Sequence, residues 1–147
     1  MRLMRMIMLP AFLVAAVVGC GESGTSLEFR LAQIADGDGL TEYVYEPTGE
    51  TFYLHDNVFI DESDVDSATV DYYDERPMVM LFLTRDGGNR FAAYTGANVG
   101  KRVAIVIKGR LVSVPKIQAP ITGGRAMIDG SFSEQEAGKI AADLSEK

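Results

Sequence analysis

The sequence predicts an α+β fold in which a mixed, mostly antiparallel sheet has two main helices packed on one face. Three observations lead to this prediction. Apolar segments of strand length fill the chain from residue 27 onward, two segments with helical spacing come later, and hairpin-like connections join several strands. Helices gathered on one face of an antiparallel sheet are a common layered arrangement for such an element order.

The first strand is expected at residues 27–31, where apolar and charged residues alternate. A two-residue period of this kind indicates a strand with one buried face. Residues 35–50 contain three glycines and a proline, so we expect a loop with a short extended piece at 43–45. Further short strands are expected at 52–54, 58–60, 68–73 and 77–83.

Two segments carry helix signals. Residues 89–98 have apolar side chains at helical spacing, and Gly100 supplies a stop signal. In the second segment, Ser133 and Glu136 form a capping box, in which each side chain satisfies the other residue's free backbone donor. Apolar residues then follow on one helix face, at Ala137, Ile140, Ala141 and Leu144.

The strands of the second half are short. A β-branched segment at 103–107 and an apolar segment at 111–114 flank a Lys-Gly pair, which predicts a hairpin. Residues 117–121, which follow Pro115 and include Pro120, are expected to be extended. A Gly-Gly turn then precedes an expected strand at 126–128.

Composition argues against several function classes. The chain has 147 residues and a net charge of −7, with one cysteine and one histidine. Phosphate binding needs a basic surface, so nucleic acid is a poor partner. One cysteine excludes an intramolecular disulfide framework and a thiolate zinc cluster, and one histidine leaves few options for a catalytic triad. We expect no cofactor, no metal site and no enzymatic activity.

The N-terminal segment predicts export. Arg2 and Arg5 precede an apolar run at 6–18. As a helix this run is about 20 Å long, which is short of the roughly 30 Å hydrocarbon core of a membrane. A basic start, a short apolar middle and a small final residue are typical of a secretory signal. The run ends in Val-Val-Gly-Cys at Cys20, and this ending resembles the lipobox of bacterial lipoproteins.

This resemblance implies a domain organisation. We expect a lipoprotein signal peptide at residues 1–19, lipidation of Cys20, a flexible Gly/Ser-rich tether at 20–26 and a single domain at 27–147. Several acyl chains on one cysteine give stable membrane attachment. The expected location is therefore the bacterial cell envelope, lipid-anchored on the extracytoplasmic side of a membrane. An ordinary signal followed by an incidental cysteine, or a transmembrane anchor, is the alternative.

A longer run carries a family resemblance. Residues 98–137 read NVGKRVAIVIKGRLVSVPKIQAPITGGRAMIDGSFSEQEA. This run strongly resembles the SecD subunit of the bacterial preprotein translocase, in the head subdomain of its first large periplasmic domain. Members of that family share a helix running into Asn-Val-Gly-Lys, an apolar strand, a Ser-x-Pro segment, a Gly-Gly-Arg turn and a Phe-(Ser/Thr)-x-x-Glu-Ala helix start. The resemblance continues upstream at 27–31 and 52–54.

The resemblance implies a SecD-head-like fold and an extracytoplasmic domain that contacts translocating polypeptide. In that family the domain moves relative to a base near the membrane, and neighbouring membrane helices couple proton flow to this movement. Here a lipobox replaces the first membrane helix, and Lys147 falls about where the family returns to its base. We therefore expect a stand-alone lipoprotein that shares the fold and the polypeptide contact but not the motor.

Motifs for catalysis or metal binding are weak. Residues 96–102 are one residue short of a phosphate loop and lack a Ser or Thr after the lysine. Residues 36–47 depart from a calcium loop at two ligand positions. The acidic residues at 61–66 favour a solvated turn over a cation site, and His55 has no nucleophile or second histidine at a telling spacing. A hydrolase would need two carboxylates that converge in a deep cleft.

Charge is unevenly distributed. Residues 31–75 contain 13 acidic residues and no Lys or Arg, whereas residues 76–125 contain nine Lys or Arg and one acidic residue. If these stretches pack together, their charges neutralise each other. If they face apart, cations form a basic strip toward anionic headgroups or an acidic partner. The strip would consist of Lys101, Arg102, Lys108, Arg110 and Lys116.

Aromatic residues offer a second candidate surface, because they provide large contact areas for an extended polypeptide. Sheet packing explains the same residues equally well; they are Tyr43, Tyr45, Tyr72, Tyr73 and Phe91.

The sequence thus predicts a non-enzymatic, membrane-tethered envelope lipoprotein. Its expected partners are unfolded or exporting polypeptide or translocase components, with a link to protein export. The alternative is a lipoprotein that binds a small molecule or a cell-wall fragment in a crevice of the same fold.

Overall fold

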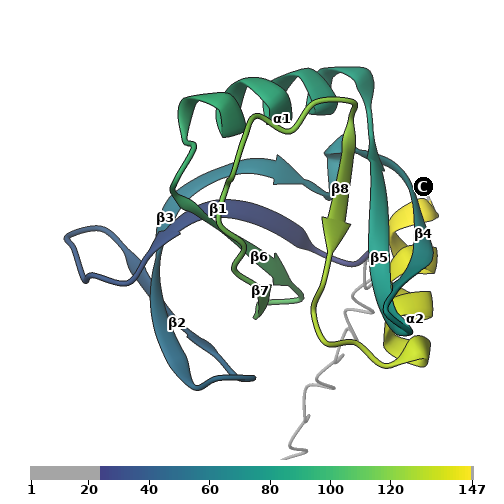
Figure 1. Ribbon diagram of the computed structural model, residues 1–147, viewed down its shortest axis with the longest axis horizontal. Coiled ribbons are helices and arrows are strands. Elements are labelled where there is room, and N and C mark those ends of the chain that lie inside the picture. Colours follow the sequence, from purple (N-terminus) through teal and green to yellow (C-terminus); the bar gives the residue numbers. More distant parts are fainter. Residues whose placement is uncertain (1–23, 147) are drawn as a thin grey trace, which may run out of the picture.

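The computed structural model describes residues 24–146 (Figure 1). The predicted signal peptide and Cys20 lie outside the described residues. The elements in chain order are β1 (Leu27–Gln33), β2 (Thr41–Tyr45), β3 (Glu50–Asp61), the 3-10 helix η1 (Glu62–Asp64), β4 (Val65–Tyr73), β5 (Arg76–Leu83), α1 (Arg85–Ala97), β6 (Arg102–Ile107), β7 (Arg110–Ser113), β8 (Arg125–Ile128) and α2 (Glu134–Ser145). Within this part of the chain, no helix is long and apolar enough to cross a membrane.

The strands form two antiparallel sheets. The larger sheet has the order β2-β3-β1-β6-β7, and the smaller has the order β4-β5-β8. The chain passes from one sheet to the other at η1, where Asp61 and Asp64 form a capping box between the end of β3 and the start of β4. The predicted α+β class with antiparallel strands and two helices is confirmed, and the structure adds the division into two sheets.

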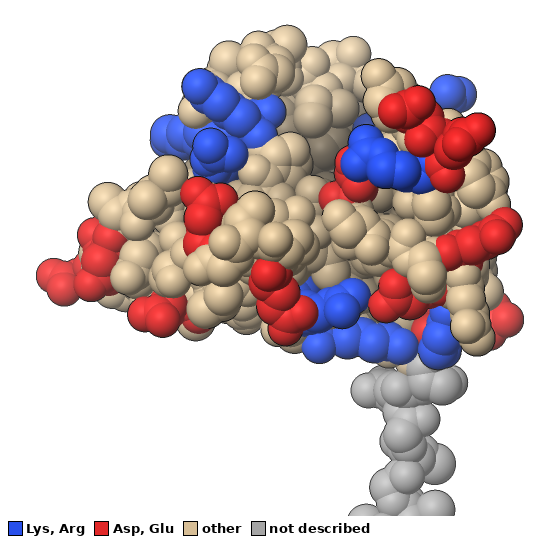
Figure 2. All heavy atoms as spheres, turned by 60° about the horizontal axis from the view of Figure 1, so that its bottom comes forward, with Lys and Arg blue, Asp and Glu red and all other residues tan. Residues whose placement is uncertain are grey.

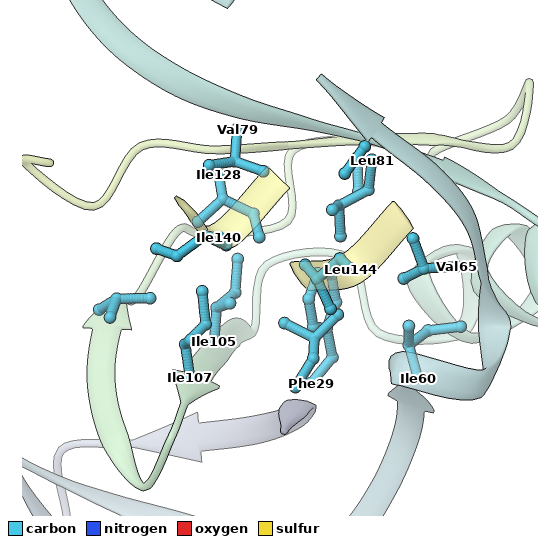
Figure 3. Packing of buried hydrophobic residues seen from close by; sticks show 14 of the residues in the cluster. Phe29, Ile60, Val65, Val79, Leu81, Ile105, Ile107, Ile128, Ile140 and Leu144 are labelled. Atoms are coloured by element: carbon cyan, nitrogen blue, oxygen red, sulfur yellow. The ribbon is translucent and has the colours of Figure 1, made fainter. Parts of the chain in front are cut away.

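The main core lies between these sheets. Side chains from the large sheet, the small sheet and α2 point toward one another there (Figure 3). Both helices contribute to this core, since Phe91 of α1 and Leu144 of α2 belong to the same cluster as Phe29 of β1. The two helices therefore lie on one face of the five-stranded sheet, as predicted. The labelled members are Phe29, Ile60, Val65, Val79, Leu81, Ile105, Ile107, Ile128, Ile140 and Leu144.

A smaller core occupies the opposite face of the large sheet. Ala104 and Val106 alternate along β6 with the residues of the main core, so they point to this other face. Phe52, Leu54 and Leu111 join them, and Tyr43 and Tyr45 pack at the margin. The sheet is curved enough to bring β2 against β7.

α2 follows its prediction closely. Ser133 accepts a hydrogen bond from the Glu136 backbone N–H (3.1 Å), and Glu136 accepts one from the Ser133 backbone N–H (2.9 Å). The four apolar residues predicted on one face are all buried. At the other end of α2, the Ser145 hydroxyl accepts from the Ala68 N–H and contacts the Ala68 carbonyl oxygen. The Ser145 hydroxyl thus contacts both the backbone N–H and the carbonyl oxygen of Ala68 in β4.

α1 begins four residues earlier than predicted. Thr84 is its N-cap and accepts a hydrogen bond from the Gly87 N–H (3.1 Å). Glycine is a poor helix former, so the sequence pattern did not predict the first turn of α1. The glycine is explained by a close approach, since a Cβ on Gly87 would lie 2.9 Å from the Cβ of Asp64. Arg90 of α1 pairs with the same Asp64 and so links the helix to η1.

One other local prediction needs correction. The short segments at 52–54 and 58–60 belong to the single strand β3, which continues through register shifts against β1. Residues 117–121, which were expected to be extended, belong to no named strand; Lys116 just before them makes an isolated bridge with Arg102, and the Ile117 N–H donates to the Lys101 carbonyl oxygen. Pro115 before that segment and Pro120 within it lack the backbone donor that a regular ladder requires. Packed structure begins at Thr25, within the segment predicted as a tether, because this side chain is buried and donates to Asp143 (2.8 Å).

Candidate functional site

A small apolar crevice lies where the segment 115–121 faces β8. Its volume is about 110 Å³. Phe29, Phe91, Val103 and Ile105 form its floor, and each of these side chains also belongs to the main core. The remaining lining residues are Pro115, Lys116, Ile117, Ile121, Arg125, Ala126 and Met127.

The outer wall of the crevice is held by hydrogen bonds from two directions. The Val103 N–H donates to the Pro115 carbonyl oxygen (2.9 Å), and the Ile117 N–H donates to the Lys101 carbonyl oxygen (2.8 Å). On the helix side, the fully buried Thr95 hydroxyl accepts from the Ile121 N–H (2.9 Å) and donates to the Phe91 carbonyl oxygen (2.8 Å). The wall is therefore fixed to β6 and to α1, although it contains no strand.

The rim of the crevice exposes apolar surface. Ile121 is 37% exposed and Met127 is 44% exposed. Met127 lies on β8, the last strand of the small sheet, which pairs with β5 along one side. Among the described strands none pairs with its other side. Strand edges and exposed apolar side chains are features that a bound polypeptide segment can cover.

The predicted basic strip divides into two groups. Lys101, Arg102 and Lys116 lie at the start of β6, where Arg102 and Lys116 are bridge partners. Lys108 and Arg110 lie beyond the other end of the same strand, about 17 Å away along a six-residue strand. On the face shown in Figure 2, the basic side chains likewise form separate groups with acidic side chains between them. The five residues do not form one continuous strip.

The two groups also differ in their ionic partners. Lys108 pairs with Asp143 (3.4 Å), and Arg110 lies 3.9 Å from Glu136. Lys139 of α2 adds a second cation to Asp143 (3.1 Å). We call these five residues the α2 edge. The hydrogen bond from Thr25, followed by that from Lys139, lowers the pKa of Asp143 below its ordinary value.

Cations near the crevice have no such partners. Among the described residues, no carboxylate lies within ion-pair distance of Lys116 or Arg125. The Arg125 guanidinium lies over the ring of Phe82, 5.5 Å from its centroid. Lys101 donates to the Asn98 side chain, and Arg102 to the Val114 carbonyl oxygen. In the part of the chain that the structure describes, one ion pair joins the acidic stretch to the basic stretch, namely Asp64–Arg90.

The five aromatic residues proposed for a groove do not meet. Tyr43 and Tyr45 pack against the small core, whereas Tyr72 and Tyr73 lie exposed at the far end of β4. Tyr72 donates to Glu134 (2.7 Å), and this hydrogen bond raises the pKa of the phenol. Phe91 alone borders the crevice. The crevice itself combines residues far apart in sequence, so no local pattern marked it.

The acidic turn is structural. Asp61 and Asp64 cap η1, and Glu62 accepts from the Leu27 N–H (3.0 Å). His55 is half-buried and lies beside Gln33 and Lys101 in a separate shallow hollow. Within residues 24–146, no group of three or more His, Cys, Asp or Glu is arranged to hold a metal ion. We find no catalytic constellation among the candidates that the sequence raised.

Fold, crevice and C-terminal motif together define an α+β domain of the kind that the sequence resemblance indicated. Residues 40–146 match the family described as SecDF, P1 head subdomain, and the chain belongs to this family. β1 lies before the matched range, yet it is the central strand of the large sheet.

Relatives and solved structures agree with this assignment. The chain is 47% identical over 69 residues to the protein translocase subunit SecDF of Thermus thermophilus, covering 47% of this chain and 9% of that protein. It is 41% identical over 66 residues to SecD of Acidaminococcus fermentans, covering 45% and 16%. The chain thus spans a small part of the length of these relatives.

A crystal structure of SecDF in a super-membrane-facing form superposes with a TM-score of 0.67 at 28% identity, over 82% of this chain and 18% of that one. A second structure, of SecDF as a membrane component that enhances protein export, also gives 0.67 at 28% identity, over 83% and 62%.

Proposed function

We propose that this chain is a non-enzymatic, extracytoplasmic lipoprotein whose SecDF-head domain binds extended polypeptide in the crevice, in connection with protein export. The observation that carries the proposal is the crevice itself. It has an apolar floor, two exposed apolar side chains on its rim and the free edge of β8 beside it. Backbone pairing to a strand edge gives affinity for any sequence, and an adjacent pocket for alternate side chains gives preference.

The size of the crevice favours a polypeptide over a small molecule or a cell-wall fragment. Small-molecule sites typically enclose roughly 300–1,000 Å³. The crevice offers about 110 Å³, which is less than an engineered cavity of about 150 Å³ that accepts benzene. It therefore accommodates one apolar side chain, while the rest of the ligand lies on the surface.

Site-specific photocrosslinking tests the polypeptide contact. A photoreactive phenylalanine at position 127 is placed on the crevice rim, and the same residue at position 135 is placed on the exposed face of α2 as the matched control. We expect crosslinks to unfolded or exporting chains from position 127 and few from position 135. Equal yields from both positions would show that contact with polypeptide does not involve the crevice.

Membrane tethering through Cys20 is the second part of the proposal. Thr25 is five positions after Cys20, and an extended chain covers at most about 3.6 Å per residue, so lipidation would hold Thr25 within about 18 Å of the membrane surface. We expect the full chain to take up a fatty-acid label and to fractionate with membranes, and Cys20→Ala to lose both properties. Unchanged labelling and fractionation of Cys20→Ala would refute the lipid anchor.

A further inference from the structure

We propose that the crevice selects apolar side chains that are accompanied by a carboxylate, so that its preferred ligands are acidic, extended segments of polypeptide. This inference rests on the proposed function, because it names the class of polypeptide that the same crevice receives. It comes from the charges around the crevice and from the geometry of β8.

The charge distribution separates the crevice from the other cationic surface. At the α2 edge, each of the three cations has a carboxylate of this chain within 4 Å. At the crevice, Lys116 and Arg125 line the cavity and have no carboxylate partner among the described residues. The lining contains two cations, no acidic residue and otherwise apolar side chains. Complementary charges across an interface favour one partner and disfavour like-charged ones.

The position of Arg125 indicates where the ligand's carboxylate lies. Arg125 and Met127 are two residues apart on β8, so their side chains stand on the same face of the strand. The core-facing neighbours Ala126 and Ile128 alternate with them. An extended segment that lies along β8 has the same two-residue period. We therefore expect a ligand whose apolar residue enters the crevice on the core-facing side, beside Ala126, and whose adjacent residue is acidic and faces Arg125.

Lys116 supplies a second contact from the opposite wall. This exposed lysine follows Pro115 on the segment that closes the crevice, and its side chain makes no ion pair within the described chain. Because β8 and this segment face each other across the cavity, a ligand between them lies near both cations. Exposed ion pairs contribute roughly 0.2–1 kcal/mol each, which corresponds to an affinity gain of about two- to thirtyfold for the pair of contacts.

A peptide series tests the inference with the full chain. The peptides share a central Leu in a Gly/Ser background and differ at the adjacent position, which is Glu, Gln or Lys. We expect affinity to fall in the order Glu, Gln, Lys, with about fivefold between neighbours at low salt. The differences should shrink as salt is added, because exposed charges are screened.

Charge-reversal variants locate the effect. Lys116→Glu and Arg125→Glu should reverse the order so that the Lys peptide binds best, whereas Lys108→Glu, the matched change at the α2 edge, should leave the order unchanged. Arg125 also contacts Phe82, so thermal unfolding of each variant checks the fold. The Lys116 side chain makes no contact of this kind. If Arg125→Glu unfolds, Lys116→Glu alone tests the charge preference.

The outcomes separate the two proposals. Equal affinity for the Glu, Gln and Lys peptides would overturn the charge preference and leave the polypeptide-binding function standing. An order that changes with Lys108→Glu and not with Lys116→Glu would also overturn it, because the carboxylate would then lie at the other edge. Absence of binding to every peptide would overturn both the function and the inference.

Discussion

The α2 edge and the crevice both combine cations with apolar side chains. They differ in how many of these cations have a carboxylate partner within the chain and in how much of the apolar surface is buried. Cations at the α2 edge meet Asp143 and Glu136, and the apolar face of α2 is buried in the main core. At the crevice, Lys116 and Arg125 have no carboxylate partner among the described residues, and Met127 exposes apolar surface. Groups that the fold leaves unpartnered are available to a ligand.

On the proposed function, stability and peptide binding depend on different parts of this small domain. Substitutions at the α2 edge and in the α2 core should then lower the free energy of unfolding without changing peptide affinity. Substitutions on the crevice rim should weaken peptide binding without lowering the free energy of unfolding.

Leu144→Ala should have the largest effect. Leu144 is buried in the main core between α2 and both sheets. Truncation of a buried leucine removes apolar contacts and leaves a cavity, so we expect a loss of about 3 kcal/mol in the free energy of unfolding. Urea denaturation measures this loss, and peptide affinity of the folded fraction should not change. A loss below about 1 kcal/mol would place α2 outside the cooperative core.

Thr95→Val should affect both properties, because this residue belongs to the core and also holds the crevice wall. The substitution keeps the shape but removes the acceptor for the Ile121 N–H and the donor to Phe91. We expect a loss of about 1.5 kcal/mol, together with weaker peptide binding as residues 117–121 lose their attachment to α1.

Thr95→Ser is the matched control for that experiment. Thr95→Ser retains the hydroxyl and lacks only one buried methyl group of the threonine. We expect it to bind peptide nearly as tightly as the original chain. If the valine variant binds peptide as tightly as the original chain, the hydrogen bond to Ile121 does not position the wall.

Most of the fold could be predicted from the sequence where a local pattern has one physical explanation. The capping box at Ser133 and Glu136 is an example, because its two side chains and the helix they cap are adjacent in the chain. Predictions failed where distant residues decide the local structure. Position 87 in the first turn of α1 is glycine because of its close approach to Asp64, a residue 23 positions earlier that no local pattern connects to it.

The candidate site was harder to predict than the fold. Two of its apolar rim residues and both cations lie in the run that carries the family resemblance, but no spacing in that run shows that they meet. The predicted basic strip contained Lys116 and omitted Arg125, which the fold brings to the same cavity. Whether a cation has an acidic partner depends on tertiary contacts, so counting charges along the chain could not separate Lys108 from Lys116.

Ser133→Ala should have an intermediate effect on stability. The hydroxyl accepts from the Glu136 N–H at the start of α2. Removing an N-cap side chain usually costs about 1 kcal/mol. Urea denaturation at neutral pH measures the change, and Ser133→Asp, which keeps a capping oxygen, should retain most of the stability. An alanine variant as stable as the original would indicate that water caps the helix equally well.

The same cap gives a pH prediction. Hydrogen bonds from the Ser133 backbone and side chain lower the pKa of Glu136 below its ordinary value of 4.5. A carboxyl whose folded-state pKa is lowered contributes stability above its unfolded pKa, and this contribution disappears as the pH falls through the folded-state pKa. We therefore expect the urea midpoint to decrease as the pH falls below 4.5. Glu136→Gln should reduce this dependence, and an unchanged pH profile would contradict the assignment to Glu136.

Met127→Ala should have the smallest effect on stability and a clear effect on binding. Met127 is 44% exposed, so truncation removes few buried contacts, and we expect a change within about 0.5 kcal/mol. The side chain nevertheless forms part of the crevice rim, and its loss should weaken peptide binding about fivefold, which corresponds to about 1 kcal/mol. Parallel urea and peptide titrations of Met127→Ala and Leu144→Ala compare the same kind of truncation in the two regions. If both variants lose stability and neither loses peptide affinity, Met127 serves the core. If Met127→Ala loses only affinity, the exposed methionine is explained by the ligand it meets.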